Sequence, residues 1–203
     1  MKNFKFLVIL LCFKSFISFG QCPVATAAPD VETLCSGGTT NVSLTSDIVG
    51  TTFTWTVVET DVTGASAASG ILIAQTLTAT GTVQGTAVYT ITPNANSCNG
   101  TPITVTVTVN PQSNAGSAGS TTICDSSSTP IDLFSLITGA QPGGTWTRPT
   151  GTGGTFDSAA GTFTPAPGAT NSTFTYTITG TSPCVNDSSV ATITINAQPN
   201  AGS

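Results

Sequence analysis

The stretch Ile103-Thr-Val-Thr-Val-Thr-Val-Asn110 alternates β-branched apolar residues with threonine at every step. Side chains of a strand point to opposite faces in turn, so the apolar set is expected to face a core and the threonines to face water. No stretch after residue 20 carries a 3.6-residue apolar stripe, and Gly, Pro, Asn and Ser clusters separate the alternating runs. The sequence predicts an all-β protein. The same alternation recurs in 51–58, 173–179 and 190–196.

Four landmark residues and a closing asparagine occur twice in the same order, offset by 86 to 91 residues. An internal repeat at this period is typical of tandem modules, each of which is long enough for one small sandwich core. We therefore expect two tandem antiparallel β-sandwich domains after a leader. The first set is Cys35, Trp55, Tyr89, Cys98 and Asn110, and the second is Cys124, Trp146, Tyr176, Cys184 and Asn196.

The linker after the first copy also returns after the second. Asn110-Pro-Gln-Ser-Asn-Ala-Gly-Ser117 recurs as Asn196-Ala-Gln-Pro-Asn-Ala-Gly-Ser203. Because such small, polar stretches are typical of linkers, we expect few contacts to cross between the two modules. The predicted domains are 21–111 and 112–198, and residues 199–203 are expected to start a further repeat of a truncated chain.

Residues 1–20 are predicted to be a secretory signal peptide. Lys2 and Lys5 precede an apolar run at 6–13, and Ser18-Phe-Gly20 is a small-x-small cleavage site. Lys14 interrupts the run, which argues against a membrane span, so no membrane insertion of the mature chain is expected. An alternative is lipidation of Cys22, which Gln21 disfavours because that processing prefers a small preceding residue. The mature chain is expected to be secreted or on the outer cell surface.

Composition excludes several function classes. The chain has 6% charged residues and no histidine. Without the leader, one arginine, Arg148, stands against nine acidic residues, a net charge of −8. Phosphate-backbone binding needs several Lys or Arg, so no nucleic-acid partner is expected. Histidine-dependent catalysis and metal ligation are absent, and we find no carboxylate pair suited to catalysis, so no enzyme activity and no cofactor are expected.

An exported chain usually pairs its cysteines. Two bridges among the five cysteines that follow the leader allow 15 arrangements. The repeat aligns Cys35 with Cys124 and Cys98 with Cys184, which predicts the bridges Cys35–Cys98 and Cys124–Cys184. Cys22 has no equivalent in the second copy and is expected to be unpaired or bonded outside these modules.

Both copies resemble the PKD-like and Ig-like repeat modules of large Bacteroidetes surface proteins. In the first copy, Cys35-Ser-Gly-Gly, Thr52-Phe-Thr-Trp-Thr56 and Ser97-Cys-Asn-Gly-Thr-Pro102 carry the likeness. In the second, Gly143-Gly-Thr-Trp-Thr147 and Gly161-Thr-Phe-Thr-Pro165 do so. The resemblance implies an exported adhesin or a gliding-motility-associated chain. Asp157-Ser-Ala159 also resembles the O-glycosylation site of that phylum, which makes Ser158 a candidate for modification.

Trp55 and Trp146 have two interpretations. Each could be a sugar-stacking platform, but their matched position favours a core role, since sandwiches commonly pack a tryptophan against an inter-sheet disulfide. Tyr89 and Tyr176 are expected in the core, with their hydroxyls bonded to backbone groups. The threonine rows suit ice binding only in a short-period solenoid, which a repeat near 86 residues is not.

Asp125 and Asp187 are weak calcium candidates. Each closely follows one cysteine of the predicted Cys124–Cys184 bridge, so the fold could bring them near each other. No EF-hand loop is present, and calcium takes six to eight oxygens; the default is solvated surface acids and no metal site.

Three functions remain open at this point. The first is a non-catalytic stalk or adhesive segment of a larger exported chain, with a surface glycan or protein as ligand. The second is an accessory glycan- or protein-binding module of an exported enzyme. The third is an enzyme whose catalytic domain lies beyond Ser203.

Overall fold

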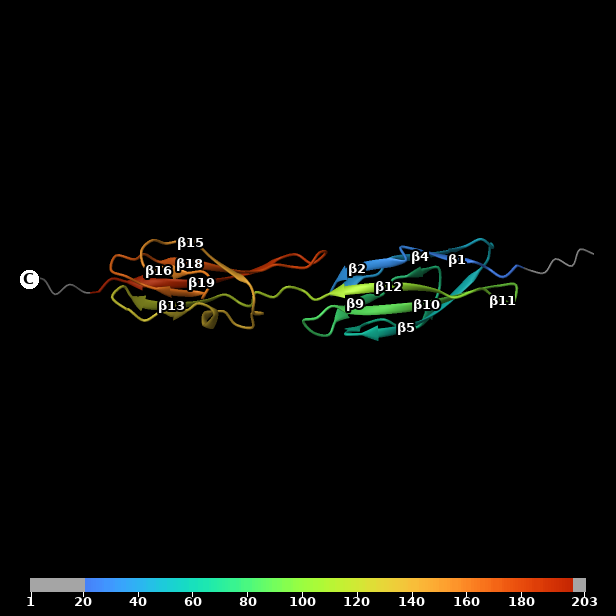
Figure 1. Cartoon of the computed structure of the whole chain (residues 1–203), viewed down its shortest axis with the longest axis horizontal. Coiled ribbons are helices and arrows are strands. Elements are labelled where there is room, and N and C mark those ends of the chain that lie inside the picture. The colour runs from blue at the N-terminus through green and yellow to red at the C-terminus, as the bar shows by residue number, and fades with distance from the viewer. Residues whose placement is uncertain (1–20, 199–203) are drawn as a thin grey trace, which may run out of the picture.

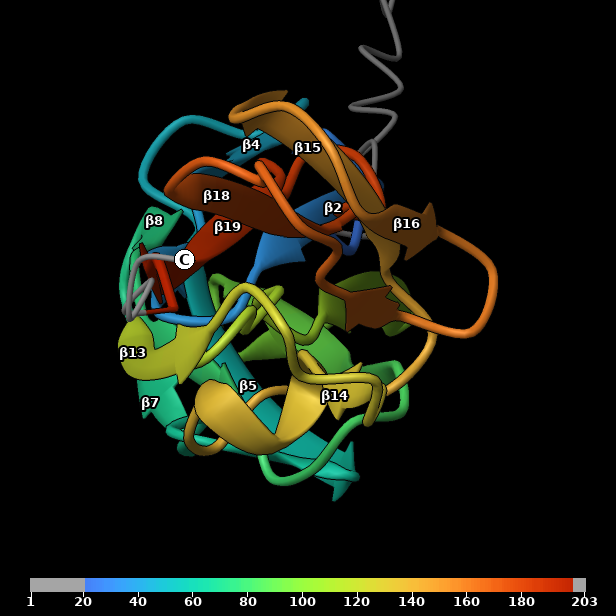
Figure 2. The same cartoon turned by 90° about the vertical axis from the view of Figure 1, so that its left-hand side faces the viewer.

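The computed structural model describes residues 21–198, so the predicted signal peptide and the segment 199–203 lie outside the described residues. The described chain is almost entirely β, as predicted, and forms two tandem sandwiches that lie end to end (Figure 1). Figure 2, seen along the long axis, shows one sandwich in front of the other. No strand of the first half pairs with a strand of the second.

The N-terminal sandwich places one large sheet against two small ones. The large sheet has the order β2-β12-β10-β5-β7, with β11 paired to β10, and the small sheets are β1-β4-β8 and β3-β9-β6. The strands are β1 (Ala25–Ala28), β2 (Val31–Cys35), β3 (Gly38–Thr39), β4 (Val42–Ser46), β5 (Thr52–Thr60), β6 (Val62–Thr63), β7 (Ala68–Ser69), β8 (Leu72–Ile73), β9 (Thr76–Ala79), β10 (Gly85–Ala95), β11 (Cys98–Asn99) and β12 (Ile103–Asn110).

The C-terminal sandwich repeats the central part of this plan. One sheet has the order β13-β19-β18-β15, which matches β2-β12-β10-β5, and the other is β14-β17-β16. The elements are β13 (Gly119–Cys124), β14 (Ile131–Asp132), the 3-10 turn η1 (Phe134–Leu136), β15 (Thr145–Thr150), β16 (Thr155–Asp157), β17 (Thr162–Thr164), β18 (Ser172–Ile178) and β19 (Asp187–Asn196).

Period-two alternation decides which side chains are buried. In β12, Val105, Val107 and Val109 are fully buried while Thr104 is exposed. In β18, Phe174 and Tyr176 are buried, with half-buried threonines between them. The buried residues form two separate hydrophobic clusters, one in each sandwich. Each large buried side chain contributes about 1.5–3 kcal/mol, so each module has its own core.

One edge of each main sheet departs from the predicted antiparallel pairing. β2 pairs parallel to β12, and β13 pairs parallel to β19, whereas the other ladders are antiparallel. The chain enters each sandwich at one end and leaves at the other, so β2 and β13, near the start of each module, run in the same direction as the last strands, β12 and β19. As neighbours they therefore pair in parallel, and their carboxyl ends meet at the exit end of the module.

Tyr89 lies at the centre of the N-terminal core. Its side chain is fully buried, and its hydroxyl donates to Gln75 Oε1 at 2.9 Å, a side-chain acceptor and not the expected backbone group. Gln75 is itself held by Ser66, whose carbonyl accepts from Gln75 Nε2 at 2.8 Å. Burial, and then the nearby Glu59 and Glu32 carboxylates, raise the pKa of Tyr89 to about 12.

This shift predicts alkaline destabilisation of the N-terminal sandwich. The unfolded tyrosine loses its proton near its ordinary pKa of 10.0, whereas the folded one keeps it until about 12. The free energy of unfolding is therefore at its full value below pH 10 and falls as the pH rises from 10 to about 12. Urea unfolding at pH 9 and pH 11.5 measures the loss. Tyr89→Phe should reduce that pH dependence, and an unchanged dependence in this variant would contradict the assignment.

Candidate functional site

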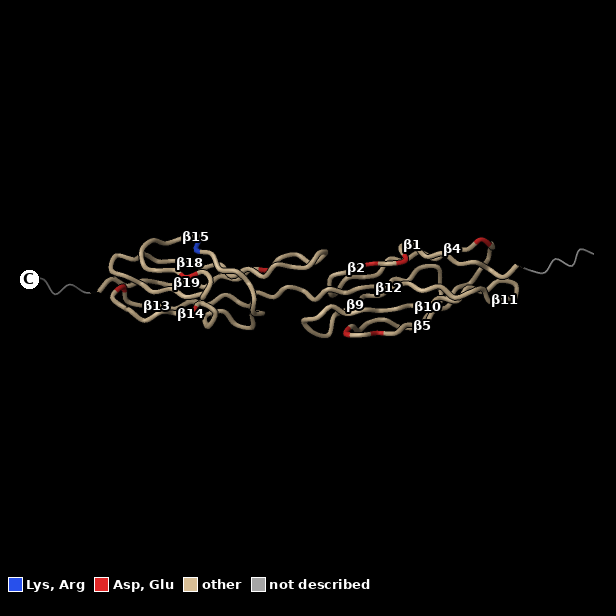
Figure 3. The backbone as a smooth tube through the Cα atoms, in the orientation of Figure 1, with Lys and Arg blue, Asp and Glu red and all other residues tan. Residues whose placement is uncertain are grey.

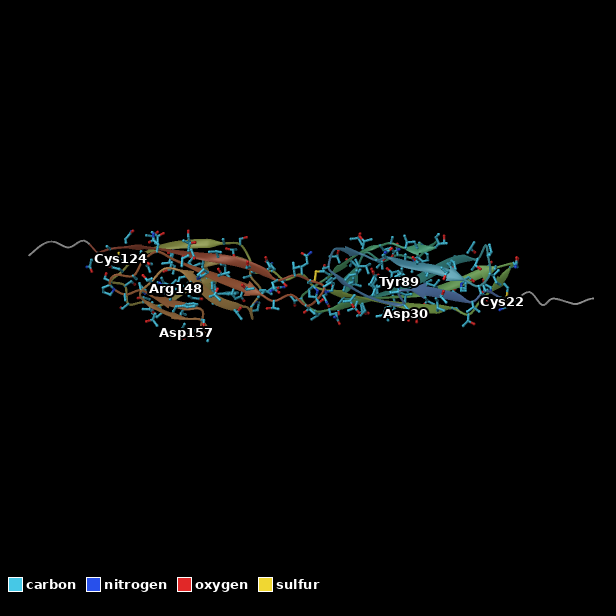
Figure 4. The ribbon with its side chains drawn as sticks, turned by 90° about the horizontal axis from the view of Figure 1, so that it is seen from above. Cys22, Asp30, Tyr89, Cys124, Arg148 and Asp157 are labelled. Carbon is cyan, nitrogen blue, oxygen red and sulfur yellow. A yellow bond between two sulfur atoms is a disulfide. The ribbon has the colours of Figure 1, made fainter. Side chains whose placement is uncertain are left out.

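The junction between the two sandwiches is held by a disulfide. Cys35 ends β2, and Cys184 lies in the loop before β19; their sulfur atoms are bonded and their Cα atoms are 5.0 Å apart. The bond appears in yellow between the two ribbons in Figure 4. The second disulfide joins Cys22 to Cys98, and Cys124 carries a free thiol.

These bridges correct the predicted pairing of Cys35 with Cys98 and of Cys124 with Cys184. Cys35 lies opposite Asn110, at the carboxyl end of β12, whereas Cys98 belongs to β11 before the start of that strand. The eight residues of β12, from Ile103 to Asn110, make seven steps of ~3.3 Å, which separate the two cysteines by more than 20 Å.

The same geometry applies in the second module. Cys124 lies opposite Asn196, whereas Cys184 precedes β19 at its other end. A disulfide needs Cα atoms less than about 7 Å apart, so neither predicted bridge is possible within one sandwich. The prediction that Cys22 is unpaired or bonded outside these modules is also wrong, because Cys22 is bonded to Cys98 of the first sandwich.

The side chain of Asn110 makes three hydrogen bonds beside the disulfide, which together we call the Asn110 clasp. Its side chain is only 2% exposed, and its Nδ2 donates to the carbonyls of Ser182 at 2.8 Å and Thr181 at 3.3 Å. Its Oδ1 accepts from Gln84 Nε2 at 2.6 Å. The last residue of the first module is thus bonded to the loop that carries Cys184.

The linker is hydrogen-bonded on both sides. Gln112 Nε2 donates to the Ser36 carbonyl at 2.9 Å, which ties it back to the first module. Asp187 accepts from the Ala115 amide at 2.7 Å, which ties it forward to β19. Among the described residues, no strand pairing and no hydrophobic cluster crosses the junction, as expected, but a disulfide and several polar contacts do. The boundary between 111 and 112 stays a prediction.

An open groove of about 640 Å³ lies along this junction. Its walls offer amide and hydroxyl groups, one carboxylate and the disulfide. Such a set can donate and accept many hydrogen bonds, but it contains no nucleophile beside a base. The lining includes Cys35, Gln112, Asn114, Gln141, Asn186 and Asp187.

Asp125 and Asp187 do not lie together. Asp187 begins β19, and the Asp125 amide donates to the carbonyl of Asn196, at the other end of that strand. Nine residues of strand separate the two ends by about 30 Å. Within residues 21–198 no group of three His, Cys, Asp or Glu residues could hold a metal ion. The acidic residues are spread over both sandwiches (Figure 3).

Both tryptophans are buried, as the core interpretation predicted. Trp55 is 5% exposed and Trp146 is 7% exposed, so neither offers a face to a sugar. Trp146 packs against Tyr176, with ring centroids 5.0 Å apart, and Trp55 Nε1 donates to the carbonyl of Ser66 at 3.1 Å. The Tyr176 hydroxyl donates to the Gln141 carbonyl at 2.7 Å, which is the predicted backbone bond.

Arg148 has a structural role that the sequence analysis missed. Its guanidinium lies over the rings of Phe163, at 4.8 Å, and Phe174, at 5.6 Å. It donates to the carbonyl of Gly153 at 2.8 Å and to Ser172 Oγ at 2.7 Å, and burial lowers its pKa. Composition indicates only its charge, since it is the one Lys or Arg of residues 21–198. Its position in β15, two residues after Trp146, was the available signal.

Arg148→Ala is therefore expected to lower the free energy of unfolding of the C-terminal sandwich by about 2 kcal/mol. The loss combines a cation–π contact with two hydrogen bonds to a charged group. Arg148→Lys keeps the charge but not the planar fork, so it should recover less than half of the loss. Urea unfolding measures both variants. A wild-type unfolding curve for Arg148→Lys would show that charge alone matters.

Ser158 lies on an exposed turn between β16 and β17. Asp157 Oδ1 accepts from the amides of Ala159, at 2.9 Å, and Ala160, at 3.0 Å, which shapes the turn and leaves the serine facing solvent. Its glycosylation remains a prediction. No helix among residues 21–198 is long and apolar enough to cross a membrane.

A model of the PKD-like domain family matches residues 32–113, which span most of the N-terminal sandwich. The match supports a PKD/Ig-like module there. The search of curated proteins found no match.

Among solved structures, the chain is similar to human mucin-like protocadherin EC1-2, with 9% identity, a TM-score of 0.39, and coverage of 86% of this chain and 99% of that one. It is also similar to the human desmocollin-1 ectodomain (8%, TM-score 0.41, covering 88% and 43%) and to sidekick-1 immunoglobulin domains 1-5 (8%, TM-score 0.42, covering 87% and 39%). The chain thus spans less than half of the latter two structures. Likeness at this level does not identify a relative.

Proposed function

We propose that this chain is a non-catalytic spacer and adhesive segment of a larger exported surface protein. The observation that carries the proposal is the junction: two sandwiches with separate cores are fixed end to end by the Cys35–Cys184 disulfide. A covalent bond between modules adds nothing to either core, but it limits bending between them. Resistance to bending between its modules is the property that a stalk requires.

Three further features support this function. The disulfides are typical of an exported protein, in agreement with the predicted signal peptide. The linker sequence of 110–117 recurs at 196–203, as expected of a chain built from repeats. The outward threonines and serines offer many weak hydrogen bonds, and avidity over many modules compensates for weak binding per module. Residues 21–203 carry a net charge of −8, so neighbouring molecules also repel each other.

Small-angle scattering on residues 21–203 tests the stalk. The oxidised chain should scatter as a single elongated rod, and adding calcium should leave the profile unchanged because the acids are dispersed. A compact particle, or a broad distribution of bent shapes, would contradict the proposal. A large rise in unfolding temperature with calcium would do the same.

The polar groove at the junction favours a second candidate, which is an accessory module that binds a glycan or an extended peptide of a surface protein. Its amide-rich walls suit hydroxyl or backbone groups, and both modules contribute to it. A glycan array measures this directly. Binding that is lost in Gln141→Ala but kept in the surface variant Val49→Ala would support this candidate. If no glycan or peptide binds, this candidate is wrong and the stalk is the remaining function.

A further inference from the structure

The two sandwiches end in the same way. At the exit end of the first, Cys35 lies opposite Asn110; at the exit end of the second, Cys124 lies opposite Asn196. The next backbone amide bonds to the asparagine carbonyl in both: Ser36 to Asn110 at 2.8 Å, and Asp125 to Asn196 at 3.0 Å. The two exit ends are therefore equivalent in register and hydrogen bonding.

The two ends differ in whether another module covers them. At the first, Cys35 is bonded to Cys184, and Asn110 is buried against the loop of the following sandwich. At the second, Cys124 is a free, exposed thiol and Asn196 is exposed. The second end thus carries the same cysteine and asparagine, and within residues 21–198 neither side chain is bonded to another module.

The entry ends also match. In each sandwich a cysteine lies between the last two long strands: Cys98 after β10, and Cys184 after β18. Both are bonded to a cysteine that lies on the entry side: Cys98 to Cys22, which precedes β1, and Cys184 to Cys35 of the preceding module. We call Cys98 and Cys184 the entry cysteines. The entry cysteine of each module is bonded to a cysteine of the segment that precedes the core strands of that module.

From this rule we infer that Cys124 forms a second disulfide between modules, which we call the second staple. In it, Cys124 has the position that Cys35 has in the first. Its partner is the entry cysteine, equivalent to Cys184, of a further module of the same plan. The inference rests on the proposed stalk function and names its next partner. As the bond forms, the two thiols lose two protons and two electrons, which a disulfide oxidant accepts as it is reduced to a dithiol.

The linker sequence supports the same geometry. Asn196 to Ser203 repeats six of the eight residues of Asn110 to Ser117, including the Asn-Ala-Gly-Ser end. In the first junction this linker contributes the Asn110 clasp and the Ala115 amide that bonds to Asp187. The repeat of this linker sequence after Asn196 is what a second junction of the same kind requires.

A fusion protein tests the inference. Residues 21–203 are followed by a second copy of residues 118–198, and the product is oxidised in a glutathione redox buffer. We expect a peptide in which Cys124 is bonded to the copy's Cys184, and one free thiol per chain, that of the copy's Cys124. Three free thiols, or Cys124 bonded elsewhere, would overturn the inference. Cys124→Ser in the same fusion is the matched control and should leave the copy's Cys184 as a thiol.

Two checks keep the result decisive. Hydrogen exchange of the copy's β18 and β19 shows whether the added module has folded. If it has not, a second fusion carries residues 29–110 with Cys35→Ser, so that its Cys98 is the entry cysteine. A free Cys124 in both fusions overturns the staple. Scattering from residues 21–203 does not depend on a bond of Cys124. It therefore tests the proposed stalk function independently of the inference about Cys124.

Discussion

Replacing Cys35 and Cys184 together with serine should turn one rod into two loosely tethered sandwiches. The bridge closes a sequence separation of 149 residues, and chain entropy assigns such a loop about 5 kcal/mol of stabilisation at most. The Asn110 clasp that remains contributes only about 1 kcal/mol per hydrogen bond. We expect the unfolding temperature to fall by several degrees and the scattering profile to broaden toward bent shapes.

The matched control for this variant is Cys124→Ser. It removes one sulfur from an exposed position outside the junction, so neither the unfolding temperature nor the scattering should change. If the double serine variant keeps the rod profile and unfolding temperature of the parent chain, the disulfide does not hold the junction. In that case the polar linker contacts alone would account for the arrangement.

Phe174→Ala should destabilise the C-terminal sandwich by about 4 kcal/mol. Phe174 is fully buried, and its ring packs 5.0 Å from Phe163 and 5.1 Å from Phe156. Truncation leaves a cavity that rigid neighbouring strands cannot fill, and it also removes one ring from beneath Arg148. Because the cores are separate, β18 and β19 should lose protection against hydrogen exchange while β10 and β12 keep theirs.

Phe134→Ala is the control, since that ring is 36% exposed and stands nearly perpendicular to the Tyr176 ring, with ring centroids 5.4 Å apart. Its cost should be less than half that of Phe174→Ala. Loss of protection in both sandwiches of Phe174→Ala would show that the two modules unfold as one unit. That outcome would contradict the division into two domains.

The strands and the cores were predictable because period-two alternation is a local signal. Val105, Val107 and Val109 could be assigned to the buried face from their spacing alone. The parallel edge was not predicted, since alternation does not say which strands become neighbours. Arg148 was missed for a related reason: its role depends on Phe163 and Phe174, which lie 15 and 26 residues further along the chain.

The disulfides show what a repeat can and cannot reveal. Aligning Cys35 with Cys124 correctly indicates that both occupy the same place in their modules. It does not indicate which cysteines are in contact, so it could not support a bridge between the two cysteines of one copy. The spacing held the missing signal: Cys98 precedes Asn110 by 12 residues that include a full strand, which already separates it from the exit end of the module.

Mass-spectrometric mapping of the oxidised, unreduced chain tests the central claim most directly. Proteolysis of residues 21–203 should release one peptide pair that joins Cys22 to Cys98 and another that joins Cys35 to Cys184, with Cys124 alkylated as a free thiol. Recovery of Cys35 bonded to Cys98 and of Cys124 bonded to Cys184 would contradict the account, because each bridge would then lie within one sandwich and no disulfide would join the two sandwiches.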